Sequence, residues 1–208
     1  MGNKTMSNKQ TTSKTTQRQA TQTRKRKQRQ SSSLIWGGLG VGIIIILGFL
    51  LWQAYRPSTG EDVPIPANYK THIQEGTPPG PYPSDPPAGG VHYENELPTR
   101  FYQETDLASL PVYPEGHLVH NLEHGYVIFW YNCAVLDESG CTQLKDGIQK
   151  VMSEFGATKL IAFPWKSLEV PLVMTSWGKL QRFETFNMSQ ALAFVKANRN
   201  RAPEPNAP

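Results

Sequence analysis

One apolar run constrains the fold of this chain more than any other feature. Residues 34–55 read LIWGGLGVGIIIILGFLLWQAY, and these 22 positions contain no charged side chain. At a rise of about 1.5 Å per residue, a helix of this length spans a hydrocarbon core of roughly 30 Å. Trp36 near one end and Trp52 and Tyr55 near the other are typical of the aromatic belts at membrane interfaces. The run therefore predicts one transmembrane helix.

The residues before this run set its predicted orientation. Residues 1–33 hold nine Lys or Arg and no Asp or Glu, and they contain almost no apolar side chains. Such a composition predicts a disordered tail, and basic residues stay on the cytoplasmic side. The apolar run is long and ends without a clear A-x-A pattern, which favours a retained signal anchor over a cleaved signal peptide. The sequence predicts a single-pass protein of the cell membrane, extracytoplasmic after Arg56.

The positive net charge belongs to the tail. Since the whole chain carries a formal +4 and the tail contributes +9, residues 34–208 carry −5. A basic tail beside a membrane span is expected to contact anionic lipid headgroups. Nucleic acid is not an expected partner. The basic tail is expected to contact lipid, and the domain beyond the membrane is acidic.

Proline is frequent in the segment that follows the apolar run. Residues 57–116 hold twelve of the seventeen prolines, which disfavour long helices and central strands. Residues 56–66 are predicted to be a linker. Many aromatic residues follow the linker, so we expect residues 67–116 to form an irregular segment, here called the wrap. The wrap is expected to pack onto the rest of a domain that covers residues 67–200. Residues 201–208 are predicted to fray.

Regular patterns begin after residue 125 and predict the order strand, helix, strand, strand, strand, helix. A strand–helix–strand start indicates a parallel pair, and the closely linked strands that follow are expected to be antiparallel. The prediction is a small α/β (α+β) domain with a mixed sheet and two helices. The strands are predicted at 126–131, 159–163, 170–176 and 180–186, and the helices at 142–155 and 189–198, the second capped by Ser189.

Cys133 and Cys141 are the two cysteines, and both lie on the side predicted to be oxidising. A disulfide between them would close the connection from the first strand to the first helix. The spacing is not C-x-x-C, so a thioredoxin-like redox pair is disfavoured. A structural disulfide is the favoured interpretation, with free thiols or a metal or redox role as alternatives.

Three of the four histidines in two short motifs are the strongest indication of chemistry. His92 ends the segment Asp85–His92, and His120 and His124 flank Glu123 in the run HLVHNLEHG. Imidazole suits zinc and copper, so we predict a metal site from the three histidines, with Glu123 as ligand or as a residue that orients a ligand. A role in handling or sensing copper or zinc is the first hypothesis. His72 and His117 are predicted to be surface or supporting residues, and Met174 is predicted to be a core residue rather than a ligand for Cu(I).

The run from His120 to His124 also matches the H-x-x-E-H pattern of inverzincin proteases. That chemistry needs a continuous helix, whereas Pro114, Gly116 and Gly125 leave room for only a turn or two. A metal-dependent hydrolase with Glu123 as general base is therefore a minor alternative, and enzymatic activity stays open. The other alternative is a non-catalytic interaction module of the cell envelope, whose histidines hydrogen-bond the backbone and serve only the fold.

These motifs resemble a bacterial family catalogued as domain of unknown function 3105. The resemblance covers roughly residues 64–198, and Gly89, Val91 and Ser176 depart from the family pattern. It implies an N-terminal membrane anchor and a clustering of the three motif histidines, and it implies no substrate. The residues that carry it are Pro86, Pro87, Gly90, His92 and Tyr93, then Leu118, Val119, His120, Leu122, Glu123, His124 and Gly125, and then Trp177 and Gly178.

Overall fold

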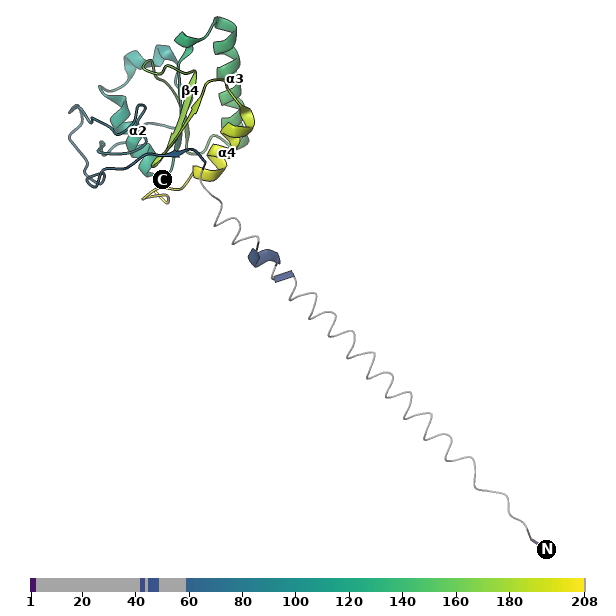
Figure 1. Ribbon diagram of the computed structural model, residues 1–208. Coiled ribbons are helices and arrows are strands. Elements are labelled where there is room, and N and C mark those ends of the chain that lie inside the picture. The colour runs from purple at the N-terminus through teal and green to yellow at the C-terminus, as the bar shows by residue number, and fades with distance from the viewer. Residues whose placement is uncertain (3–41, 44, 49–58, 208) are drawn as a thin grey trace. The chain divides into compact units, whose positions relative to one another are not determined.

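The computed structural model describes residues 1–2, 42–43, 45–48 and 59–207 (Figure 1). Almost all of the predicted basic tail and most of the predicted membrane span lie outside these residues. Within the described parts, no helix combines the length and the apolar character needed to cross a membrane. The chain divides into two compact units, Met1–Arg56 and Pro57–Pro208. The features below belong to the second unit.

Five strands form one mixed sheet in the order β1-β5-β4-β2-β3. The strand β2 (Val127–Tyr131) runs parallel to β3 (Leu160–Pro164) and antiparallel to β4 (Leu172–Ser176). Next to β4 lies β5 (Lys179–Phe183), and the short β1 (Glu61–Asp62) pairs with β5, both antiparallel. The predicted mixed sheet, with a parallel first pair followed by antiparallel strands, is confirmed.

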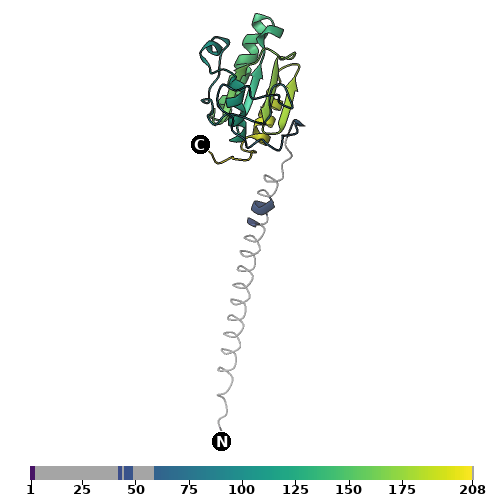
Figure 2. The same cartoon turned by 90° about the vertical axis from the view of Figure 1, so that its left-hand side faces the viewer.

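Both faces of the sheet are covered, each by its own hydrophobic cluster. The side chains of β2 alternate between these two clusters. Its first, third and fifth residues pack with α3 (Glu138–Glu154) and α4 (Met188–Asn198). Its second and fourth residues pack with α2 (Pro114–Glu123) and the wrap. In Figure 1, α2 lies on one side of β4, and α3 and α4 lie on the other; Figure 2 shows the same layers turned by 90°.

Side-chain caps fix where α3 and α4 begin. The Asp137 carboxylate accepts the Gly140 N–H at 2.6 Å, so α3 begins at Glu138, earlier than the predicted residue 142. The Asn187 side-chain oxygen accepts the Gln190 N–H at 3.0 Å. The cap of α4 is therefore Asn187, and the prediction of Ser189 was wrong.

Segments without long regular structure extend the sheet at one edge and cover its other edge. One edge is β1, which lies inside the predicted linker 56–66. At the other edge, the Tyr102 N–H donates to the Ala162 carbonyl of β3 at 2.9 Å, and the Ala162 N–H donates to the Arg100 carbonyl at 3.2 Å. A covered edge no longer offers unpaired backbone groups to other chains.

The C-terminal residues, which we predicted to fray, make hydrogen bonds beside the end of α2. The Glu204 N–H donates to the Glu123 carbonyl at 3.0 Å. The Lys159 ammonium donates to the carbonyls of Pro205 at 3.0 Å and Ala207 at 2.8 Å. These contacts tie the chain end to the helix that carries the second histidine motif.

The predicted disulfide between Cys133 and Cys141 is present and joins η2 (Cys133–Val135) to the first turn of α3. The two cysteines and Glu104 also form a second group of candidate metal ligands, and the disulfide bears on whether this group can bind a metal. Metals bind the thiolate form of cysteine, and both sulfurs are bonded to each other here. The structure therefore assigns the cysteines to the fold.

Candidate metal centre

Helix α2 positions the second histidine motif. Pro114 stands in its first turn, where a missing N–H costs no helical hydrogen bond, so the proline starts the helix. The helix then runs for ten residues to Glu123, and our expectation of only a turn or two was wrong. His124 is the C-cap, and Gly125 follows with φ 85°, the left-handed conformation that commonly ends helices.

Gly116 allows the segment with the first motif to lie directly on α2. A Cβ at this position would come within 2.5 Å of the Tyr93 ring. That ring is buried, and its hydroxyl donates to the Thr77 carbonyl at 2.6 Å, so it has little freedom to move away. The backbone N–H of Tyr93 donates to the Gly116 carbonyl at 3.3 Å. The close approach holds His92, the neighbour of Tyr93, beside the helix.

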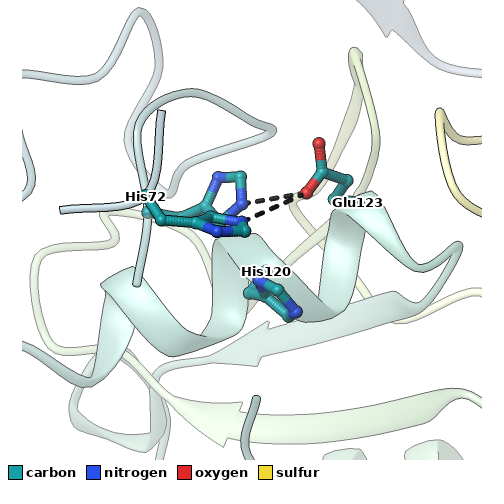
Figure 3. A group of neighbouring side chains, drawn as sticks. His72, His120 and Glu123 are labelled. Carbon is teal, nitrogen blue, oxygen red and sulfur yellow. Dashed lines mark ion pairs between the residues drawn. The ribbon is translucent and has the colours of Figure 1, made fainter. Parts of the chain in front are cut away.

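Four side chains, two of them from α2, form a cluster of candidate metal ligands (Figure 3). His72, His92, His120 and Glu123 each offer one donor atom, and these four atoms lie within 4.8 Å of one another. His120 and Glu123 are three residues apart on α2 and so share one side of the helix. His72 and His92 come from the wrap, where they pair through a single parallel β-bridge. We call this set the His₃Glu cluster.

His92 is fully buried, and both of its ring nitrogens are constrained. Its Nδ1 lies 2.8 Å from the Gly90 carbonyl oxygen. Since a carbonyl only accepts, Nδ1 carries the proton, and a neutral ring then has its lone pair on Nε2. That Nε2 lies 2.9 Å from Oε2 of Glu123, itself only 3% exposed. A backbone oxygen that fixes the tautomer in this way is the usual support of a metal-binding histidine.

His120 is a buried member of the cluster with an unpartnered ring nitrogen among the described residues. The residue is 6% exposed, and its Nδ1 has no hydrogen-bond partner among the described residues. Burial, together with the nearby His124, His92 and His72, lowers the pKa of His120 to about 4; a hydrogen bond with the Tyr93 backbone opposes the shift. The ring is therefore neutral at pH 7 and has a lone pair available to a cation.

His72 is the exposed member of the cluster. Its side chain is 43% exposed, and its Nε2 lies 4.0 Å from Oε2 of Glu123. The ring packs against those of His92 and His120, with centroids 4.8 and 5.3 Å away. We predicted a surface or supporting residue, and the structure adds His72 to the group of candidate ligands.

His124, one of our predicted ligands, does not join that group. Its Nδ1 lies 3.0 Å from Oε2 of Glu96, and its Nε2 lies 3.8 Å from Glu204. The ring still packs against His120, with centroids 4.3 Å apart. The helix ends at Glu123, so α2 supplies the pair His120 and Glu123 instead of the two histidines that an inverzincin helix requires.

His117 and Met174 also lie apart from the cluster. The buried His117 has Nδ1 2.7 Å from the Asn95 carbonyl and Nε2 3.4 Å from a Glu75 oxygen, so it links α2 to the wrap. Met174 is fully buried in the hydrophobic cluster beneath α3 and α4, on the other face of the sheet from α2. The prediction of a core methionine is confirmed.

Three imidazole nitrogens and one carboxylate oxygen suit a transition-metal ion. In a tetrahedral zinc site, ligands at about 2.0–2.2 Å from the metal lie roughly 3.4 Å from one another. The ligand atoms of the His₃Glu cluster all lie within 4.8 Å of one another, and Nε2 of His92 and Oε2 of Glu123 are 2.9 Å apart. Side-chain movements that shift each ligand atom by about 1 Å would thus suffice for all four atoms to coordinate one ion.

The sequence contained little indication of His72. It lies twenty residues before His92, outside both histidine motifs, in a segment with no helical or alternating pattern. What brings the two together is the bridge in which the Ile73 N–H donates to the His92 carbonyl at 2.9 Å. Irregular chain paths of this kind leave no periodic signal, so only the tertiary structure reveals the contact.

Comparison with known proteins supports the resemblance seen in the motifs. A sequence model of the family described as "Protein of unknown function (DUF3105)" matches residues 72–208. Searches of curated proteins and of solved structures returned no match. The matched range begins at His72 and contains the whole His₃Glu cluster and the disulfide. Because the match covers well over half of the sequence, this chain belongs to the DUF3105 family.

Proposed function

We propose that this protein binds one transition-metal ion, zinc or copper, through the His₃Glu cluster. The observation that carries the proposal is the pair formed by His92 and Glu123. The Gly90 carbonyl holds the proton of His92 on Nδ1, so the lone pair of a neutral ring faces the Glu123 carboxylate at 2.9 Å. Two buried acceptors in contact repel each other, and a cation bound between them removes that repulsion.

The alternative in which the histidines serve only the fold explains part of the pattern. His117 and His124 have oxygen partners that link α2 to neighbouring segments, and a structural role accounts for both. A protonated His92 paired with Glu123 would fit the same view. The purely structural alternative, however, leaves the buried Nδ1 of His120 without a partner among the described residues, whereas a shared metal ion engages the rings of both His92 and His120.

Zinc and copper are favoured over magnesium and calcium. Imidazole is a good ligand for the first two metals, whereas the latter two prefer oxygen ligands in larger numbers. A role in metal handling is favoured over hydrolysis. A hydrolase needs a substrate cleft at the metal, and none of the four cluster residues lines the cavity beside the proline-rich wrap.

Metal analysis of the full-length chain, purified without a histidine tag, tests the proposal. After incubation with equal amounts of zinc and copper and removal of excess metal, we expect about one equivalent bound. The double variant His92→Ala/Glu123→Gln is expected to retain less than about a tenth of that amount, because it loses two buried donors. The metal content would be measured by mass spectrometry of the elements.

The matched control is His124→Gln, which changes the histidine outside the cluster. We expect this variant to hold as much metal as the wild-type chain. A folded wild-type protein that retains neither metal would refute the proposal. Equal loss in His124→Gln and in the double variant would instead show that the ligand set is wrong, because His124 would then be a ligand.

We also propose that residues 34–55 anchor the protein in a cell membrane, with the unit Pro57–Pro208 outside the cytoplasm. The uncharged run, the basic residues before it and the disulfide support this location, since disulfides persist in oxidising compartments.

A membrane-impermeant maleimide tests this topology. Each of two variants carries one added cysteine, Ser13→Cys in the tail or Ser153→Cys on the exposed side of α3. In spheroplasts, we expect the reagent to label Ser153→Cys at once and Ser13→Cys only after permeabilisation. The wild-type chain is the control, because its two cysteines are joined in the disulfide. The reverse labelling pattern would refute the proposed orientation.

A further inference from the structure

The members of the His₃Glu cluster differ sharply in their exposure to solvent. His92, His120 and Glu123 are 0%, 6% and 3% exposed, whereas the His72 side chain is 43% exposed. The His72 ring also packs over two of the buried rings. Of the four donors, His72 is therefore the one that separates the other three from solvent.

The three buried residues are held in place much more firmly than His72. His120 and Glu123 belong to α2, and His92 is fixed by its hydrogen bond to Gly90. For the His72 ring, the contacts found in the structure are ring packing and the 4.0 Å approach to Glu123. The backbone beside it is tied to the wrap by the hydrogen bond from Ile73 to His92.

Two histidines and one glutamate are also sufficient to hold zinc by themselves. Zinc sites with this donor set keep a fourth position for an exchangeable ligand. In this protein, the buried members of the cluster supply that set, and His72 stands where the exchangeable ligand would be.

Building on the proposed metal site, we infer that His72 is an exchangeable fourth ligand past which the ion enters and leaves. The other three ligands retain the ion, and His72 controls how fast it is released. During exchange, the bond from the metal to the His72 nitrogen breaks, and a bond to an incoming ligand forms. No electron is transferred, and the metal keeps its charge.

The test uses full-length protein loaded with one equivalent of zinc, and follows zinc transfer to an excess of the chelator 4-(2-pyridylazo)resorcinol by absorbance. We expect His72→Ala to keep its zinc after gel filtration but to release it about 10- to 100-fold faster than the wild-type chain. Millimolar imidazole should slow this release towards the wild-type rate, because it occupies the vacated position. His92→Ala should hold little zinc with or without imidazole, since its position is buried.

Lys70→Ala is the matched control, because Lys70 is an exposed neighbour of His72 outside the cluster. Its release rate should equal that of the wild-type chain. Release from His72→Ala at the wild-type rate would overturn the inference, as would complete loss of zinc from this variant, which would make His72 an obligatory ligand. In both cases the proposed metal site would stand. A folded wild-type chain that retains neither zinc nor copper would overturn the proposed function and this inference together.

Discussion

Replacing Asn121 with leucine is expected to lower the free energy of unfolding by about 2–5 kcal/mol, because two buried backbone groups lose their partners. Asn121 is fully buried in α2, and its side chain forms two hydrogen bonds with Leu97 of the wrap. Its oxygen accepts the Leu97 N–H at 3.1 Å, and its amide nitrogen donates to the Leu97 carbonyl at 3.0 Å. Leucine matches the size of asparagine but can make neither bond. Urea denaturation would measure the change.

The same substitution should weaken metal binding, although Asn121 is not a candidate ligand. The two hydrogen bonds to Leu97 hold the irregular segment that begins at His92 against α2, the helix that carries His120 and Glu123. We expect the zinc affinity of Asn121→Leu to fall about 10- to 100-fold, the range seen when groups that support metal ligands are removed. Competition with a chelator would measure it.

Two variants serve as controls for this prediction. Asn121→Asp keeps the acceptor for the Leu97 N–H but places a buried carboxylate oxygen against the Leu97 carbonyl, so its loss of stability should be at least as large as that of Asn121→Leu. Asn95→Ala changes an exposed side chain in the same segment and leaves intact the backbone oxygen that contacts His117. Its stability and zinc affinity should match those of the wild-type chain. Unchanged zinc affinity in Asn121→Leu would show that the Asn121–Leu97 contact does not position the ligands.

Replacing Trp130 with alanine is expected to lower the free energy of unfolding by about 3–5 kcal/mol. Trp130 lies in β2 between β3 and β4 and is fully buried in the cluster beneath α2. Its indole N–H donates to the Thr175 hydroxyl at 2.7 Å, and its ring packs against Phe163 and Trp165 at centroid distances of 5.8 and 5.2 Å. Alanine would remove the ring, leave a cavity and deprive Thr175 of its partner.

Trp130→Phe separates these contributions. Phenylalanine fills most of the space but cannot donate to Thr175, so we expect a loss of about 1–3 kcal/mol. Chemical denaturation of the three proteins, with equal slopes against denaturant concentration, would give the comparison. If Trp130→Ala unfolds with nearly wild-type stability, the face of the sheet beneath α2 is not the close-packed core that the structure shows.

Local sequence patterns were sufficient to predict most of the sheet and both helices after residue 125. The run Val127–Tyr131 consists of β-branched and aromatic residues that favour a doubly buried strand, and the apolar spacing along α3 matches a helix. Boundaries were less well predicted, because a cap depends on one side chain rather than on a period. Asp137 and Asn187 accept the N–H groups that start their helices, and no repeating pattern marks them.

The sequence by itself determined the uncharged run, the disulfide pairing, the order of strands and helices after residue 125, and three of the four candidate ligands. Each of these rests on composition or on neighbours within a few residues, where propensity and periodicity act. The tertiary structure alone decided that His72 joins the cluster and that His124 turns to Glu96. Both outcomes depend on where an irregular, proline-rich segment crosses α2. That path is set by contacts between residues more than twenty positions apart, such as those of Asn121 with Leu97.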